Sequence, residues 1–217
     1  MATDQLSLYN LALTVYLGER RLASLTENRE PRRALDDVWT GGGGAVKACL
    51  EQGHWKFAQR TSKIDYTASI APTFGYRYGF TIPSDQVRVS KMCSDEYLNE
   101  PLLHYADEAG VWYSDIQTIY VSYVSSHASF GGDMSLWPES FTNFVACYLA
   151  QRIATRITGT ETKEEKLTKK CQTLLVDARS KDAMQGPTQF TPSGSWVRAR
   201  HTSGPARDGG SRSNLIG

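Results

Sequence analysis

The sequence predicts a mainly α-helical protein that has a bundle of about four helices, a small inserted antiparallel β-domain and an extended C-terminal tail. Apolar residues recur at intervals of three and four in several segments, which is the spacing of one helix face. Short aromatic and β-branched runs, separated by isolated Pro and Gly, fill the middle of the chain. The expected division is a helical domain over residues 1–58 and 126–186, a β-rich inserted subdomain over 59–125, and a tail over 187–217.

The N-terminal segment predicts a helix that is apolar on most faces and therefore largely covered. Thr3 or Asp4 suits its N-cap, and Gly18 suits its end. The stretch GERRLASLTEN (18–28) is typical of a loop. The apolar residues of this helix are Leu6, Leu8, Tyr9, Leu11, Leu13, Val15 and Tyr16.

A second helix is predicted to begin near Pro31, which fits a first helical turn, and to end at Gly53. Its apolar stripe advances in steps of four and three and passes straight through a run of glycines. The stripe consists of Leu35, Trp39, Gly42, Val46, Cys49 and Leu50. The glycine run therefore has three interpretations: a phosphate-binding loop, a linker, or part of a helix.

Spacing disfavours a phosphate-binding loop in TGGGGAVKACLEQ (40–52). A Walker A motif needs Gly directly before the lysine and Ser or Thr after it, whereas Lys47 stands between Val46 and Ala48. The dinucleotide fingerprint G-x-G-x-x-G fails as well, because its third glycine would fall on Val46 or Lys47.

The unbroken stripe favours a continuous helix over a linker. A helix through the run costs about 0.8–1 kcal/mol per glycine relative to alanine. Packing can offset this cost, because a patch without side chains lets another backbone approach closely. We therefore expect Gly41, Gly42, Gly43 and Gly44 to form a helix-packing patch against a neighbouring subunit's helix or the first helix of the same chain.

The middle of the chain predicts one small antiparallel sheet. In its last apolar run, Ile119, Val121 and Tyr123 occupy alternate positions, as in a strand with one buried face. The runs with this character are YRYGFTIP (76–83), QVRVSKM (86–92), GVWYSD (110–115) and TIYVSYV (118–124).

Helical periodicity then returns in two segments. Pro138 suits the first turn of the third helix, which should end near Gly159. Thr162 and Glu165 resemble a capping box at the start of the fourth helix, which should end before Gly186. The two stripes are Phe141, Phe144, Val145, Tyr148, Leu149 and Ile153, and then Leu167, Cys171, Leu174, Leu175 and Ala178.

The last 33 residues contain six Gly, three Pro and five Ser, and few apolar residues. Such a segment cannot bury enough surface to fold alone, so another chain would have to hold it. Its arginines and its tryptophan suit either nucleic acid or an acidic groove on a protein, and we favour the protein. The candidate contact residues are Trp196, Arg198, Arg200, Arg207, Arg212, Leu215 and Ile216.

No catalytic or metal-binding pattern stands out, so we expect no enzymatic activity, no cofactor and no metal. Asp36 and Asp37 are adjacent and would point about 100° apart on a helix. The histidines lack ligand spacing, and SSHAS (125–129) lacks the flanking G-x-S-x-G of a nucleophile elbow. The cysteines lack C-x-x-C spacing and are expected to be reduced, mostly buried thiols: Cys49, Cys93, Cys147 and Cys171.

Charge and hydropathy suggest neither a membrane protein nor a free nucleic-acid binder. The net charge is +1 at pH 7. No apolar run reaches the roughly 18 residues of a membrane span, and MATDQLSLYN lacks the basic and apolar regions of a secretory signal.

Several stretches, taken in order over most of residues 5–187, resemble the head-to-tail adaptor family of tailed phages, often called tail tubular protein A in short-tailed phages. The loop LGERRLAS, the segment W-x-F-A and the helix L-A-x-R-I-A with a following I-T-G carry the resemblance together. The glycine run departs from the family pattern, in which this stretch is usually a glycine-poor helix. The stretches of the chain that resemble the family include ALTVYLGERR (12–21), HWKFAQR (54–60), YRYGFTIPSDQVRV (76–89) and LWPESFTNF (136–144).

The resemblance implies a structural virion protein: a dodecameric ring that joins the capsid portal to the tail and extends the DNA-ejection channel. Genomic DNA would pass through its lumen without sequence-specific binding. The β-domain would face the next tail component: a tail nozzle, a tail tubular B-like protein or another tail protein. The tail would dock on the portal protein through Trp196, Leu215, Ile216 and the four arginines. A tail-associated peptidoglycan hydrolase is the alternative. The expected location is the tail or neck of the virion, after synthesis in the host cytoplasm.

Overall fold

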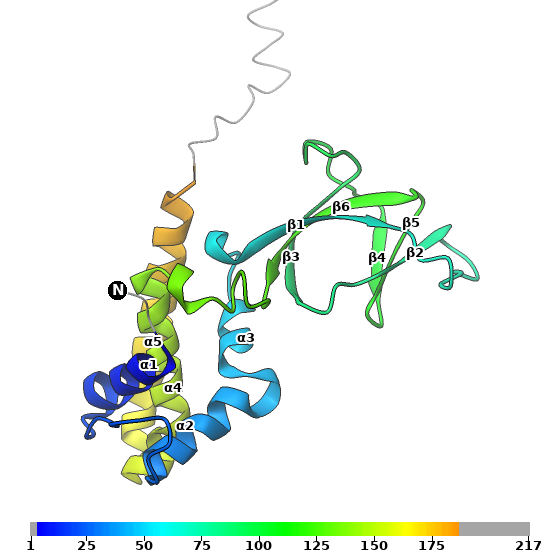
Figure 1. Ribbon diagram of the computed structural model, residues 1–217. Helices are drawn as coiled ribbons and strands as arrows, with labels where there is room; N and C mark the ends of the chain where they lie inside the picture. Colours follow the sequence, from blue (N-terminus) through cyan, green and yellow to red (C-terminus); the bar gives the residue numbers. More distant parts are fainter. Residues whose placement is uncertain (1–3, 187–217) are drawn as a thin grey trace, which may run out of the picture. The chain divides into compact units, whose positions relative to one another are not determined.

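The computed structural model describes residues 4–186, in which helices and strands have comparable weight (Figure 1). It has 45% helix and 20% strand, with two three-stranded antiparallel sheets. The prediction of a mainly α protein with a small β-domain is therefore wrong. Two strands, β1 (Gln59–Asp65) and β4 (Tyr105–Glu108), were not predicted, because their residues are mostly polar and apolar residues do not alternate in them.

The first helix begins and ends where the sequence predicts. α1 (Gln5–Leu11) runs directly into the π-helical turn η1 (Ala12–Leu17). The Asp4 carboxylate accepts a hydrogen bond from the Ser7 N–H at 2.8 Å, as an N-cap does, and Gly18 follows the last turn. The fully covered apolar residues of this segment are Leu8, Tyr9, Ala12, Leu13 and Leu17.

The glycine run ends the second helix instead of continuing it. α2 (Glu30–Thr40) is followed by a short 3-10 turn, η2 (Gly41–Gly43), and by α3 (Ala45–Leu50). Gly42 has a φ of 59° and Gly44 a φ of 93°, values that a helix cannot contain and that residues with a Cβ rarely adopt. The prediction of a continuous helix is therefore wrong. The apolar stripe persists across the turn, because α3 still places three residues in the core: Ala45, Cys49 and Leu50.

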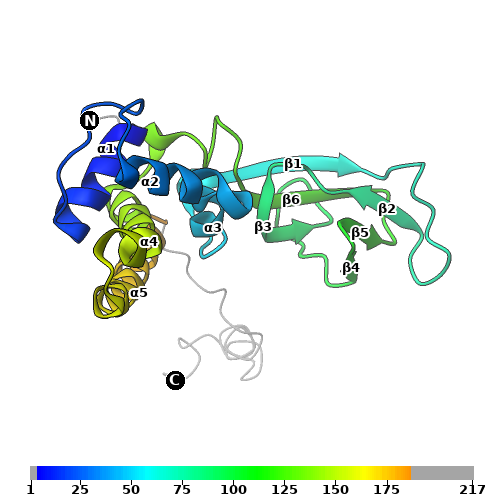
Figure 2. The same cartoon turned by 90° about the horizontal axis from the view of Figure 1, so that it is seen from below.

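Two long helices, α4 (Glu139–Thr158) and α5 (Glu161–Met184), lie side by side (Figures 1 and 2). Gly159 ends α4, as predicted, whereas Pro138 lies at the N-cap position, one residue before the first turn in which it was predicted. α4 is buried on several sides, whereas α5 buries one face. The buried residues of α5 include three of its predicted stripe, namely Leu167, Cys171 and Ala178.

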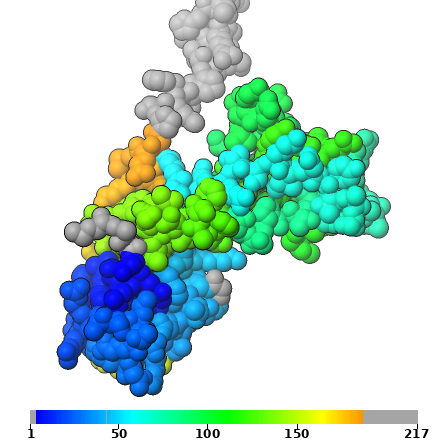
Figure 3. Space-filling view, viewed as in Figure 1, coloured from blue at the N-terminus to red at the C-terminus, as the bar shows by residue number. Residues whose placement is uncertain are grey.

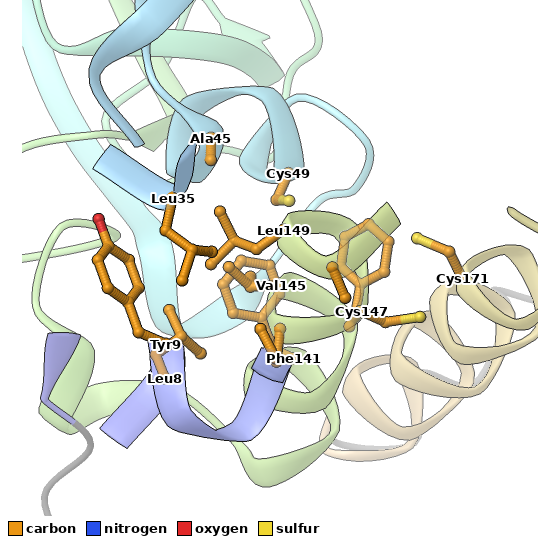
Figure 4. Close-up of a cluster of buried hydrophobic side chains, with 14 of the residues drawn as sticks. Leu8, Tyr9, Leu35, Ala45, Cys49, Phe141, Val145, Cys147, Leu149 and Cys171 are labelled. Carbon is orange, nitrogen blue, oxygen red and sulfur yellow. The ribbon is translucent and has the colours of Figure 1, made fainter. Parts of the chain in front are cut away.

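The main hydrophobic core surrounds α4. Side chains from α1, α2 and α3 meet those of α4 on one side, and α5 covers another (Figure 4). This core explains why the helical segments separated by the strands form one unit. Its labelled members are Leu8, Tyr9, Leu35, Ala45, Cys49, Phe141, Val145, Cys147, Leu149 and Cys171.

Trp55 anchors the chain as it leaves the helices. Its ring centroid lies 4.8 Å from that of Phe141, and its Nε1 donates a hydrogen bond to the Cys49 carbonyl oxygen at 3.3 Å. The short turn η3 (Lys56–Ala58) leads from there into β1, and η4 (Met134–Leu136) leads back towards α4. Both crossings between helices and strands therefore run beside the main core.

The strands form two antiparallel sheets. One has the order β1-β6-β3, in which β6 (Thr118–Ser125) pairs with β1 and with β3 (Gln86–Cys93). The other has the order β2-β5-β4, in which β5 (Val111–Ser114) pairs with β2 (Tyr78–Thr81) and with β4. The four predicted runs all contain a strand, but two sheets replace the single sheet that we expected.

A second core joins the two sheets. It contains Phe80 and Trp112 from one sheet, and Met92 and three residues of β6 from the other. Ile119, Val121 and Tyr123 are fully buried, as predicted, but the alternation holds only at the start of β6, because Ser122, Val124 and Ser125 are buried as well. We refer to residues 59–125 as the β segment.

Candidate functional site

The seven tail residues predicted to contact a partner lie outside the described residues. They are Trp196, Arg198, Arg200, Arg207, Arg212, Leu215 and Ile216. Their role therefore stays a prediction from the sequence.

The glycine run is a tight turn between α2 and α3. The Gly44 N–H donates a hydrogen bond to the Gly41 carbonyl oxygen at 2.9 Å, which closes the turn, and the Gly44 carbonyl oxygen accepts the first α3 hydrogen bond, from Ala48 N–H at 3.1 Å. A Cβ added to Gly41 or Gly42 would meet no atom of the described chain within 4 Å. The first helix of the same chain is thus not the element that packs on these two glycines.

The turn forms one wall of a cavity of about 330 Å³, which we call the glycine cavity. Asp37 and Val38 from α2 and two residues of α4, Tyr148 and Arg152, complete much of its lining. The side chains of α4 reach it because they lie one helical turn apart on the same face. The structure therefore places the glycines beside an open recess rather than against a packed helix.

The arginine side chains around the glycine cavity come from α4. The Arg152 guanidinium lies 5.5 Å from the centre of the Tyr148 ring, and its Nε donates a hydrogen bond to the Tyr148 hydroxyl at 3.3 Å. Arg156, one turn further on, pairs with Asp37 and Glu30 at 2.6 Å each. Hydrogen bonds to Asp37 and Glu30 raise the pKa of Arg156 above its ordinary value.

These exposed pairs are worth little individually, but together they tie α2 to α4 beside the cavity. The Asp37 carboxylate forms an ion pair with Arg156, so Arg152 is the cationic side chain that lines the glycine cavity. Arg152 was not predicted from the sequence. The available signal was the i, i+4 spacing of a tyrosine and an arginine on one predicted helix.

The β segment exposes apolar side chains, and sequence reasoning missed these as well. Phe74, Leu103 and Tyr97 are 89%, 80% and 75% exposed. Tyr66 and Tyr105 are partly exposed in the same segment. The strand-forming segment, cyan to green in Figure 3, presents its own surface beside that of the N-terminal helices. Each of these exposed side chains is a candidate contact for another protein.

Residues 4–186 contain no group of three or more His, Cys, Asp or Glu side chains that could hold a metal ion. In the same part of the chain, no helix combines the length and the apolar character that crossing a membrane requires. The four cysteines are buried and free, as predicted. Burial raises the pKa of Cys49 well above its ordinary value, so this thiol stays protonated.

Comparison with known proteins gives no family assignment. No protein-family model matches the chain, and no curated protein matches it significantly.

Proposed function

We propose that the protein is a structural adaptor of a tailed-phage virion, which forms a ring between the capsid portal and the tail and extends the DNA channel. The resemblance of the segments between residues 5 and 187 to head-to-tail adaptors supports this function. The structural observation that supports it most is the exposure of large apolar side chains on the β segment. Phe74, Tyr97 and Leu103 are at least 75% exposed, and protein-binding surfaces are enriched in aromatic side chains of this kind.

In this proposal the β segment binds the next tail component, a nozzle or tail tubular B-like protein. The glycine cavity receives a side chain of the neighbouring subunit, since the space beside Gly41 and Gly42 is open and Tyr148 supplies an aromatic wall. A contact between two different surfaces of the same chain closes into a ring when the rotation fits.

The segment after Gly186 binds the portal protein. Its sequence has few apolar residues, so it cannot bury enough surface to fold alone, and in this proposal the portal supplies its binding partner. The protein then resides in the tail or neck of the virion, after synthesis in the host cytoplasm.

The test compares binding to the cognate portal and to the distal tail protein for the full chain and two variants. A chain that ends at Gly186 keeps every residue of the main core, since these lie between Leu8 and Ala178, and should fold but lose portal binding. The variant Phe74→Ser/Leu103→Ser should keep portal binding. It should bind the tail protein about tenfold or more weakly, because two apolar contacts are lost.

The matched control is Val15→Ser/Leu136→Ser, which removes two exposed apolar side chains outside the β segment. It should bind both partners like the unchanged chain. Portal binding of undiminished affinity by the shortened chain would refute the tail assignment. Undiminished tail-protein binding by the Phe74/Leu103 variant would refute the role of the β segment.

A further inference from the structure

A second cavity, of about 420 Å³, lies where the turn after α3, strand β3 and the last turns of α5 meet. Four basic side chains line it: His54, Lys56, Arg88 and Arg179. They come from three segments that are far apart in the sequence, so only the folded chain brings them together. The volume falls within the range of about 300–1,000 Å³ that is typical of small-ligand pockets. We call it the basic cavity.

The two arginines are held by backbone carbonyl groups rather than by carboxylates. Arg88 Nη1 donates a hydrogen bond to the Glu51 carbonyl oxygen at 3.1 Å, and Arg179 Nη2 donates one to the Gln52 carbonyl oxygen. Within residues 4–186, neither arginine forms an ion pair. Each guanidinium has five N–H donors, so both are oriented by one hydrogen bond and keep donors for an anion.

The carboxylate that lines the basic cavity, Asp182, is hydrogen-bonded to the backbone. Its two oxygens accept the Lys56 backbone N–H at 3.1 and 3.3 Å, and the residue is 8% exposed. The Lys56 ammonium group donates a hydrogen bond to the Ala183 carbonyl oxygen at 2.9 Å. Lys56, Arg88 and Arg179 therefore line the cavity together with one carboxylate, and the cavity carries an excess of positive charge.

His54 lies within reach of both guanidinium charges. Its Nδ1 is 3.2 Å from Ser90 Oγ. Burial lowers the pKa of His54, and the charges of Arg88 and Arg179 lower it further. An anion that enters beside the two arginines should therefore change the pKa of His54.

We propose that the basic cavity is a binding site for a phosphate-class oxyanion, held by the guanidinium groups of Arg88 and Arg179. Planar guanidinium groups bind phosphate oxygens through pairs of parallel N–H···O bonds, about twice as strong as neutral ones. Because the arginines are anchored beforehand, they lose little freedom when the anion binds. The anion is either free phosphate or a phosphate group of a nucleic-acid backbone, and both present the same oxygens. This site is independent of the adaptor function proposed above.

The test is a calorimetric titration of the full-length protein with inorganic phosphate, together with the NMR titration of the His54 ring. Phosphate should bind and raise the pKa of His54, because a negative charge now lies beside the imidazole. Arg88→Gln/Arg179→Gln should bind phosphate about tenfold or more weakly. The matched control, Arg20→Gln/Arg77→Gln, removes two exposed arginines away from the cavity and should bind like the unchanged chain.

A second double variant, Arg88→Lys/Arg179→Lys, keeps both charges and removes the forked geometry of the guanidinium groups. It tests their role if the glutamine variant fails to fold. It should bind phosphate severalfold more weakly. A short oligonucleotide that displaces phosphate from the cavity would identify a backbone phosphate as the ligand, and failure to displace it would identify the free ion. No binding to the unchanged chain, equal binding by both cavity variants, or equal weakening in the control would overturn the proposal.

Discussion

At the scale of single residues, the carboxylate of Asp85 organises the polar side of the β segment. It accepts hydrogen bonds from Arg60 Nη1 at 2.9 Å, from Ser125 Oγ at 2.5 Å and from the Tyr123 hydroxyl at 3.3 Å. Partial burial alone would raise the pKa of Asp85, but the hydrogen bonds from Ser125 and Arg60 and the charge of Arg60 hold it below its ordinary value. The group therefore ties the turn before β3 to β1 and β6.

Replacing this carboxylate should destabilise the protein in a pH-dependent way. Asp85→Asn should lower the free energy of unfolding by about 1–3 kcal/mol near neutral pH, since a charge-assisted acceptor is lost. A depressed carboxylate pKa contributes stability that is present above the unfolded-state pKa and is lost as the pH falls through the folded-state pKa. The difference between the unchanged chain and Asp85→Asn should therefore shrink below about pH 4.

Urea unfolding at a series of pH values measures this difference. Glu165→Gln, which removes an exposed carboxylate on α5, is the control and should differ little from the unchanged chain at any pH. A difference for Asp85→Asn that stays constant down to about pH 3 would show that the charge of Asp85 does not contribute.

At the scale of elements, the turn between α2 and α3 changes what glycine substitutions should do. Gly42→Ala should lower the free energy of unfolding by about 1–2 kcal/mol, because alanine is strained at a φ of 59°. Gly41→Ala is the matched control, since Gly41 has a φ of −71° and open space beside it. It should leave stability unchanged or raise it by up to about 1 kcal/mol.

Urea unfolding of both variants separates the turn from an unbroken helix. In a continuous helix both substitutions would raise stability, because alanine has the higher helix propensity. An increase in the unfolding free energy of Gly42→Ala would therefore contradict the turn.

The elements that were predicted well carry local signals at their ends. Asp4, Gly18 and Gly159 each mark a helix end through capping geometry, which depends on a few neighbouring residues. The turn at the glycine run was not predictable from the apolar stripe, because the same spacing serves one long helix or two short ones on the same core. β1 and β4 were missed because their partners, rather than their own residues, determine that they are strands.

The candidate sites were less predictable than the elements. The glycines were singled out, but their role as a cavity wall depends on Tyr148 and Arg152, which lie about a hundred residues further along the chain. The basic cavity joins the turn after α3, β3 and the end of α5, and no local pattern connects them. Such sites follow from tertiary contacts and cannot be read from spacing.

At the scale of the whole molecule, the helices, together with Val124 of β6, form one hydrophobic core and the two sheets form another, and the β segment keeps large apolar side chains exposed. A protein that serves as a platform needs both a rigid body and surfaces that only a partner covers. The proposed ring contact at the glycine cavity, the tail and the β segment would give the chain three separate binding surfaces. We expect these surfaces to assemble the chain into a ring on a portal.

Measuring the mass of the full-length protein alone and after mixing with cognate portal rings tests this claim most directly. The mixture should contain a complex in which a dodecameric ring of this chain is bound to each portal, because a closed ring repeats one contact between subunits. A mass for the mixture equal to the separate masses of the portal and the free protein would contradict it.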